Sequence, residues 1–249
     1  GYFIIDGKEK TIIAQEKFAD NMIYIKTLNK NDIYSHLSEI RSVSEDSSKQ
    51  IRKTTVKIIR PTKTYSNNQI VVFVPNVKKP VPLFILMRAL GIISDKDIIK
   101  TCLLDLDKNK SKLELFIPSV QDGVTVLDQP SALNYIKTFT KRNTLSDVMQ
   151  ILSDYFLPHV GELNFSEKAY FIGVMVNKML NVFTEKDKPT NRDSFKFKRV
   201  ELSGTLIHDL FREYFLIQKR AISVKLDNEY YFHRGKYIHL ENDDDQMEY

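Results

Sequence analysis

Cysteine, glycine and proline are all scarce in this 249-residue chain, which contains one Cys, eight Gly and eight Pro. The single thiol, Cys102, excludes an internal disulfide and a zinc site made of several cysteines, and it suits a reducing intracellular compartment. We expect it to be a small core residue. No repeat or low-complexity tract is present. With 42% hydrophobic residues, the chain can bury a substantial core and form one or two domains.

The sequence also lacks a signal peptide and any uninterrupted apolar run long enough to cross a bilayer, so we expect no membrane contact. It starts at Gly1 rather than at Met, directly in strand-like residues. We therefore expect the chain to be a piece of a longer protein.

Catalytic motifs are missing as well. The sequence has no glycine-rich phosphate loop, no paired acids and no catalytic triad, so we predict neither a catalytic residue nor a metal site in this chain. His36 and Glu39 could form half of a metal site, but without further ligands we interpret them as a hydrogen-bonded structural pair. His159 follows a helix end, where we expect it to bind the terminal carbonyls rather than to take part in catalysis.

Charge is the feature that points to a partner. The net charge is +5 with a pI near 9.0, which permits contact with nucleic acid without requiring it. Basic residues concentrate in one loop, which we predict to contact phosphate; they are Arg192, Lys196, Lys198 and Arg199. A solvated connection with scattered charges is the alternative. Near the C-terminus, Glu241–Glu248 is acidic and is predicted to be a mobile surface segment.

The first third of the chain has the alternation and turn residues of β structure. Asp6-Gly7 predicts the turn of a hairpin within residues 2–16. Between residues 22 and 75 we predict four further strands, at Met22–Ile25, His36–Arg41, Ile51–Arg60 and Gln69–Val74.

Helices dominate the prediction after residue 80. The apolar run after Pro82 predicts a buried helix, in which Arg88 must find a partner or reach the surface. Further helices are expected after Ser94, from Pro130, from Thr144 to Leu157, over Glu167–Phe183 and from Leu202 to Phe215. For Leu113–Val126 we expect a strand pair or turn. The mixture predicts an α+β fold.

Several phrases in this sequence are similar to second-largest subunits of multisubunit DNA-directed RNA polymerases. They occur in the family's order over about residues 1–215, at 1–16, 35–42, 84–92, 122–123, 156–159, 169–180 and 192–204. Ser194 and Lys196 in the last phrase, and Thr205 directly after it, stand where the family commonly has His, Gly and Pro. The loop should follow a different backbone path, because Lys196 cannot adopt a positive φ cheaply.

The resemblance implies a lobe domain over residues 22–190, inserted into a protrusion domain represented by residues 1–21 and 191–249. In that family the two regions form one side of the DNA cleft. They bind other subunits, including the largest and a small zinc-ribbon subunit, and initiation factors. The catalytic magnesium lies in the largest subunit, so we expect no cofactor in this piece and no activity from it alone.

Two other classes of protein stay open at this point. One is a free-standing nucleic-acid-binding module, which should interleave aromatic and basic residues on strands. The other is a viral interaction or capsid-associated protein without enzymatic activity. The Lys-, Asn- and Ile-rich composition suggests a large DNA virus or a protist as the source. The protein would then work in a nucleus, a cytoplasmic viral factory or a virion.

Overall fold

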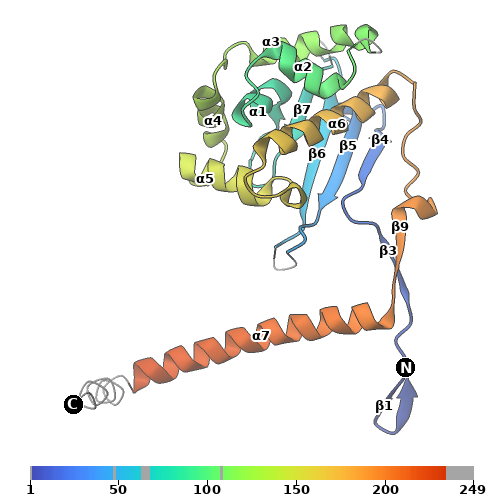
Figure 1. Ribbon diagram of the computed structural model, residues 1–249, viewed down its shortest axis with the longest axis vertical. Helices are drawn as coiled ribbons and strands as arrows, with labels where there is room; N and C mark the ends of the chain where they lie inside the picture. Colours follow the sequence, from blue (N-terminus) through green and yellow to red (C-terminus); the bar gives the residue numbers. More distant parts are fainter. Residues whose placement is uncertain (1, 47–48, 63–67, 107–108, 234–249) are drawn as a thin grey trace. The chain divides into compact units, whose positions relative to one another are not determined.

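An antiparallel sheet of five strands organises residues 19–197 in the computed structural model (Figure 1), which describes residues 2–46, 49–62, 68–106 and 109–233. The strands follow one another in chain order across the sheet. They are β4 (Ile23–Thr27), β5 (Tyr34–Ser42), β6 (Arg52–Ile59), β7 (Ile70–Phe73) and β8 (Val81–Pro82). All four strands predicted for residues 22–75 are confirmed.

The sheet has one covered and one open face, because side chains alternate between faces along each strand. Registers align Ser38 with Val56, and Val56 with Val72, on the covered face. Helix α6 (Phe165–Phe183) lies across that face (Figure 1), and its Phe183 ring meets the His36 ring at 5.3 Å. The core therefore lies between β5–β7 and α6. The opposite face of the strands carries charged residues together with the buried Leu37, Thr55 and Val71.

Short helices complete the layer that covers the sheet. They are α1 (Leu83–Ala89), α2 (Asp95–Leu103), α3 (Ile117–Gly123), α4 (Gln129–Lys137) and α5 (Leu145–Gln150), with the 3-10 helices η1 (Lys110–Phe116) and η3 (Pro158–Val160) and the π-helix η2 (Ile151–Tyr155). The capping prediction for α5 is confirmed, because the Thr144 hydroxyl accepts the Asp147 backbone N–H at 3.2 Å. Cys102 is buried, as expected, and burial raises the pKa of its thiol.

The strand pair or turn predicted for Leu113–Val126 is wrong, because η1 and α3 occupy this segment. Three of its buried residues, Phe116, Ser119 and Gly123, are spaced three and four apart, which is the helical period. Two of them are not apolar, so the hydrophobic pattern did not reveal the period. The Ser119 hydroxyl instead accepts the Ile70 backbone N–H at 3.0 Å and ties α3 to β7.

Buried cations satisfy the carbonyl groups that the short helices leave unpaired. Arg88, 2% exposed, donates to the Gly123 carbonyl at 2.6 Å and forms an ion pair with Asp95. Its predicted need for a partner is thereby confirmed. Lys168 on α6 is fully buried and donates to the carbonyls of Leu152 and Ser153, each at 2.7 Å. These side chains hold neighbouring helices together through backbone groups rather than through apolar contact alone.

The second unit contains residues 1–18 and 198–249. The hairpin β1 (Phe3–Ile5) and β2 (Lys8–Lys10) turns at Asp6 and Gly7, both with positive φ, as predicted. Strand β3 (Gln15–Phe18) pairs antiparallel with β9 (Lys198–Glu201). The basic segment expected to be a loop up to Leu202 is thus a strand from Lys198 onward.

Helix α7 (Ser203–Phe232) is longer than the predicted Leu202–Phe215 helix, and none of its described residues is buried. Ile4 of the hairpin and Phe211 of α7 are each 69% exposed, so the hairpin leaves the apolar side of α7 uncovered. The acidic segment Glu241–Glu248 lies outside the described residues. In the part of the chain that the structure describes, no helix is both long and apolar enough to cross a membrane.

Gly173 allows α2 and α6 to approach closely, which gives a first prediction. A Cβ at this position would lie 2.4 Å from the Thr101 carbonyl oxygen, a backbone atom that cannot move aside alone. We expect Gly173→Ala to lower the free energy of unfolding by about 1–3 kcal/mol in urea titrations. Gly204→Ala is the control, because its Cβ would enter open space. Equal stability of the two variants would show that the helices separate without cost.

Lys168 gives a second prediction, because burial lowers the pKa of its ammonium to about 8. The unfolded chain therefore binds more protons than the folded chain between pH 8 and 10.5, the pKa of an ordinary lysine. We expect Lys168→Met to be destabilising, and the deficit relative to wild type to widen as pH rises through this window. Lys178→Met, at an exposed position on the same helix, is the control. A pH-independent difference for Lys168→Met would contradict the assignment.

Candidate nucleic-acid interface

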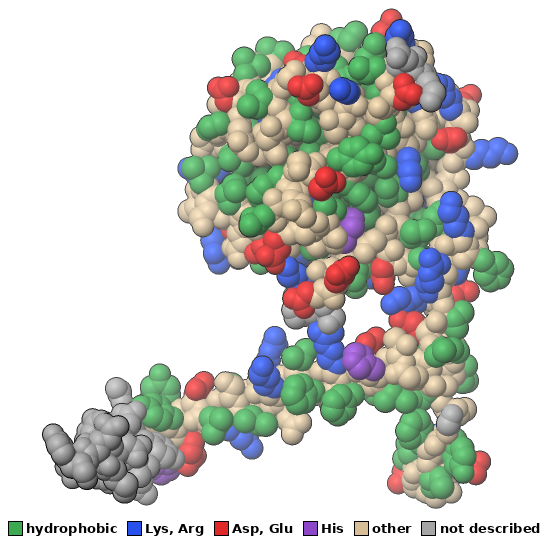
Figure 2. Space-filling model, viewed as in Figure 1, with side chains coloured by type: hydrophobic (Ala, Val, Ile, Leu, Met, Phe, Trp, Pro, Cys, Tyr) green, Lys and Arg blue, Asp and Glu red, His purple; other side chains and the backbone are tan. Residues whose placement is uncertain are grey.

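The four predicted phosphate contacts fall into both units of the chain. Arg192 and Lys196 belong to residues 19–197, whereas Lys198 and Arg199 belong to the unit with β3 and β9. In Figure 2, several Lys and Arg side chains lie along the segment between α6 and β9. Each pair has its own surroundings.

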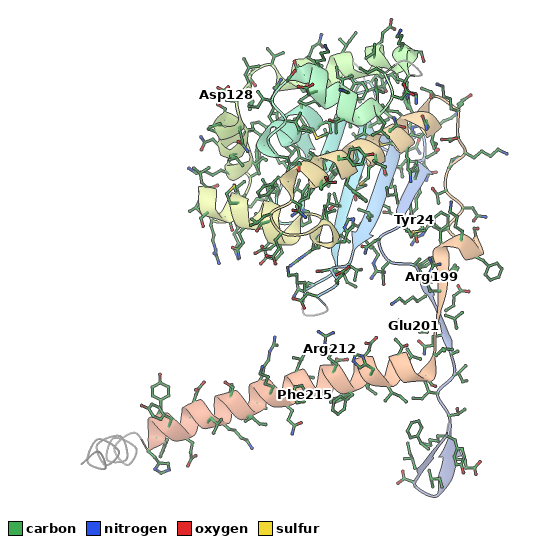
Figure 3. All side chains as sticks on the ribbon, viewed as in Figure 1. Tyr24, Asp128, Arg199, Glu201, Arg212 and Phe215 are labelled. Carbon is green, nitrogen blue, oxygen red and sulfur yellow. The ribbon has the colours of Figure 1, made fainter. Side chains whose placement is uncertain are left out.

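Arg192 and Lys196 are positioned by aromatic rings. The Arg192 guanidinium lies 5.2 Å from the centre of the Tyr24 ring on β4 (labelled in Figure 3), and that ring packs against Phe197 at 5.2 Å. The Lys196 side chain is exposed, with its ammonium 5.5 Å from the Phe197 ring. Lys196 lies in the short 3-10 helix η4 (Phe195–Phe197) and does not have a positive φ, which agrees with the expectation from sequence.

Glu39 on β5 gathers cations on the open face of the sheet. Its carboxylate oxygens lie 2.9 Å from the Lys26 ammonium, 2.7 Å from that of Lys53 and 3.9 Å from the Arg192 guanidinium. We call Lys26, Glu39, Lys53 and Arg192 the Glu39 cluster, and its net charge is +2. Burial alone would raise the pKa of Glu39, but hydrogen bonds from Lys53 and Lys26 outweigh it and lower the pKa. Glu39 is therefore ionised and fixes the cations at their positions.

The basic character of this face continues along β6. Lys57, two residues beyond Thr55 on the same face, places its ammonium 4.4 Å from the Tyr34 ring and 4.4 Å from the Phe73 ring. Burial is the main cause that lowers the pKa of Lys57. Cations and aromatic rings thus alternate across β4 to β7, an arrangement suited to a charged, planar or phosphate-bearing ligand.

Sequence reasoning missed Lys26, Lys53 and Lys57. The alternation over residues 52–59 places Lys53, Thr55 and Lys57 on one side and Thr54, Val56 and Ile58 on the other. That signal could have identified two of the three lysines. Nothing local could have placed Lys26 beside Glu39, because their proximity depends on the pairing of β4 with β5.

Lys198 and Arg199 differ in how exposed their side chains are. Lys198 forms an ion pair with Glu16 and lies 4.3 Å above the Phe18 ring, which leaves its side chain 15% exposed. Arg199, labelled in Figure 3, is exposed and donates to the Lys198 carbonyl at 2.7 Å. Lys198 therefore contributes mainly to the β3–β9 pair, and the Arg199 side chain is the more exposed of the two.

Neither histidine behaves as predicted. His36 and Glu39 point to opposite faces of β5 and do not form the expected pair, because His36 packs against Phe183 while Glu39 binds lysines. His159 contacts the Ser42 hydroxyl through Nδ1 at 2.7 Å rather than the terminal carbonyls of a helix. Burial lowers the pKa of both imidazoles, which keeps them neutral and structural.

The described residues also do not fit a metal ion. Across residues 2–46, 49–62, 68–106 and 109–233, no three His, Cys, Asp or Glu side chains gather in a way that could hold one. Magnesium prefers carboxylate and other oxygen ligands, and the one carboxylate of the Glu39 cluster is surrounded by cations that would repel it. The cations and rings of this face are suited to binding through charge and ring contacts.

Comparison with known proteins identifies the chain. Residues 19–201 match the sequence model of the family described as RNA polymerase Rpb2, domain 2. The DNA-directed RNA polymerase II subunit RPB2 of Encephalitozoon cuniculi is 40% identical over 86% of this chain and 19% of its own length. The DNA-directed RNA polymerase II subunit 2 of Arabidopsis thaliana is 30% identical over 97% of this chain and 21% of its own length.

An archaeal relative, the DNA-directed RNA polymerase subunit Rpo2 of Saccharolobus solfataricus, is 28% identical over 91% of this chain and 20% of its own length. This chain thus spans about a fifth of the length of these relatives. The resemblance noted in the sequence is confirmed, and the chain belongs to the family of second-largest RNA polymerase subunits, in which it contains domain 2.

Proposed function

We propose that this chain is a non-catalytic part of a DNA-dependent RNA polymerase, in which it lines one side of the DNA path. The observation that carries the proposal is the family match over residues 19–201, together with relatives named as DNA-directed RNA polymerase subunits. The reaction, nucleotidyl transfer, would be performed by the assembled enzyme. Magnesium would be bound elsewhere in that enzyme, since the described residues here do not fit it.

In this proposal, residues 22–190 are the lobe, and residues 1–21 with 191–249 belong to the protrusion. The β3–β9 pair supports the second assignment, because it joins the N-terminal segment to the segment after the lobe. The exposed apolar side chains of α7, among them Leu210, Phe211 and Phe215, also fit a helix that packs against further parts of a larger domain. Figure 2 shows hydrophobic side chains along this helix.

Contact with DNA would be made to phosphates and not to bases. The Glu39 cluster, Lys196 and Arg199 present cations at the surface. Such contacts release counterions and are independent of sequence. A DNA path in a processive enzyme needs this property, because every sequence must pass along it.

The partners would be the other polymerase subunits, including the largest and a small zinc-ribbon subunit, and initiation factors. An intracellular, reducing location, in a nucleus or a viral factory, is part of the same proposal and agrees with the single buried thiol. The origin from a large DNA virus stays a prediction from composition.

The DNA proposal predicts that Lys196→Ala combined with Arg199→Ala weakens binding to duplex DNA. The affinity should fall equally for unrelated sequences, and the slope of log affinity against log salt should decrease by about 1 for each phosphate that is no longer neutralised. Lys96→Ala combined with Lys178→Ala removes the same charge from exposed positions elsewhere and is the control. Fluorescence anisotropy with labelled duplexes measures both. If the Lys196→Ala, Arg199→Ala variant keeps the affinity and the salt slope of the wild type, the loop is only a structural connection.

Glu39→Gln should act in the opposite direction. The substitution raises the net charge of the Glu39 cluster by one and frees Lys26 and Lys53 from their common partner. We expect tighter DNA binding at low salt and a lower free energy of unfolding, by about 1–3 kcal/mol, because hydrogen bonds to a neutral amide oxygen are weaker than those to a carboxylate. The stability difference should shrink as pH falls below 4.5, the pKa of an ordinary glutamate, because wild-type Glu39 then becomes protonated. DNA affinity that is unchanged or reduced would remove the cluster from the proposed path.

A further inference from the structure

A second basic feature lies at the end of the sheet where α4 and α5 meet, on elements that the proposed DNA face does not include. It is a hollow of about 740 Å³ between the turn after β7, the loop from α4 to α5, and η2. The lining residues are Asn76, Val77, Lys78, Lys141, Arg142, Asp147, Gln150, Ile151 and Tyr155. Three of the nine are cations, and one is a carboxylate.

The backbone around this hollow is anchored at several points. The Lys78 backbone N–H donates to the Phe139 carbonyl at 3.0 Å, which fastens the turn after β7 to the end of α4. Thr140, 2% exposed, bonds the Lys137 carbonyl through its hydroxyl at 3.0 Å. The next two residues, Lys141 and Arg142, therefore extend from a fixed point. Tyr155 is held on another side by the Arg52 guanidinium, 4.5 Å from the centre of its ring.

The three cations differ from those of the Glu39 cluster in their partners. Within the described residues, Lys78, Lys141 and Arg142 form no ion pair with a carboxylate, whereas Lys26, Lys53 and Arg192 all approach Glu39. A concave surface with converging cations of this kind is favourable for an anion. The side chains are exposed, so an anion can reach them without rearrangement of the fold.

Charge balance indicates which anion fits. Lys78, Lys141 and Arg142 with Asp147 give the hollow a net charge of +2. A phosphorylated serine or threonine carries about −1.5 to −2 at pH 7, and its three oxygens can each accept a hydrogen bond. A nucleic-acid phosphodiester carries only one charge, and a continuous strand needs a track of cations rather than a single hollow. The apolar residues Val77 and Ile151 further suit the residues that flank a phosphorylated side chain in a peptide.

We propose that the hollow between α4 and α5 binds a phosphorylated serine or threonine side chain of a partner protein. Arg142 provides the planar donor for two phosphate oxygens, and Lys78 and Lys141 provide point charges beside it. Tyr155 and Gln150 offer neutral polar groups at the rim. The site would couple the chain to a regulatory phosphorylation event, and it does not depend on whether the opposite sheet face binds DNA.

The test uses the whole 249-residue chain and small probes, observed by NMR through the backbone amides of residues 138–151. The probes are N-acetyl-phosphoserine methylamide, its unphosphorylated counterpart, inorganic phosphate and the dinucleotide dTpdT. We expect the phosphoserine probe to bind most tightly. Lys141→Ala combined with Arg142→Ala should weaken it by about tenfold or more, as for the loss of a charge-assisted hydrogen bond.

Lys96→Ala with Lys178→Ala is the matched control and should leave the affinity unchanged, since both residues are exposed and lie outside the hollow. Circular dichroism verifies that both double variants are folded. Equal binding of the unphosphorylated probe would overturn the proposal, as would equal or tighter binding of inorganic phosphate or of dTpdT. Binding of none of the four probes, or an equal loss in both double variants, would also overturn it.

Discussion

The two-residue period of β5 and β6 is the constraint on which both the core and the cationic face depend. Ile40, Val56 and Ile58 point toward α6 and are almost fully buried, and the residues between them must then point away. Glu39, Lys53 and Lys57 therefore meet on the open face without any dedicated loop. A shift of one residue in either strand would exchange the two sets and bury the charges. The same register that makes the core stable thus fixes the geometry of the candidate interface.

The charged side chains of this protein have two separate roles, one in stabilising the fold and one in forming the candidate interface. Arg88 and Lys168 are buried, and they bind backbone carbonyls of short helices, so their effect is on the fold. The cations around Glu39 are partly exposed and keep a net positive charge that a ligand can neutralise. A count of basic residues, or a net charge of +5, does not distinguish these roles. The two roles are distinguished by the burial of each side chain and by the identity of the atom that it contacts.

Local sequence signals predicted much of the fold. The Asp6-Gly7 turn, the strands between residues 22 and 75, the buried helix after Pro82 and the Thr144 cap all depend on neighbours within a few residues. The hydrophobic pattern did not predict helix α3, because its buried residues Ser119 and Gly123 serve hydrogen bonding and close packing rather than apolar contact. For the candidate site, the sequence predicted Arg192, Lys196, Lys198 and Arg199 as phosphate contacts, and this stays a prediction. Their surroundings depend on strand pairing and, for Arg192, on the Tyr24 ring, and both involve residues far away along the chain. The pairing of β3 with β9 likewise joins segments separated by about 180 residues and has no local signal.

The pairing of Phe18 with Lys198, followed by the hydrogen bond from Ala19 to Phe197 at 2.8 Å, means that the chain enters and leaves the larger unit at one point. Residues 19–197 are thus inserted between β3 and β9 of the smaller unit. The two strands pair with each other, so the ends of the inserted segment lie side by side. The inserted unit can therefore grow, shrink or acquire new surfaces during evolution while the host keeps its chain path. In a multisubunit assembly, sequence changes in such an inserted unit can alter its surface without changing the path of the surrounding chain.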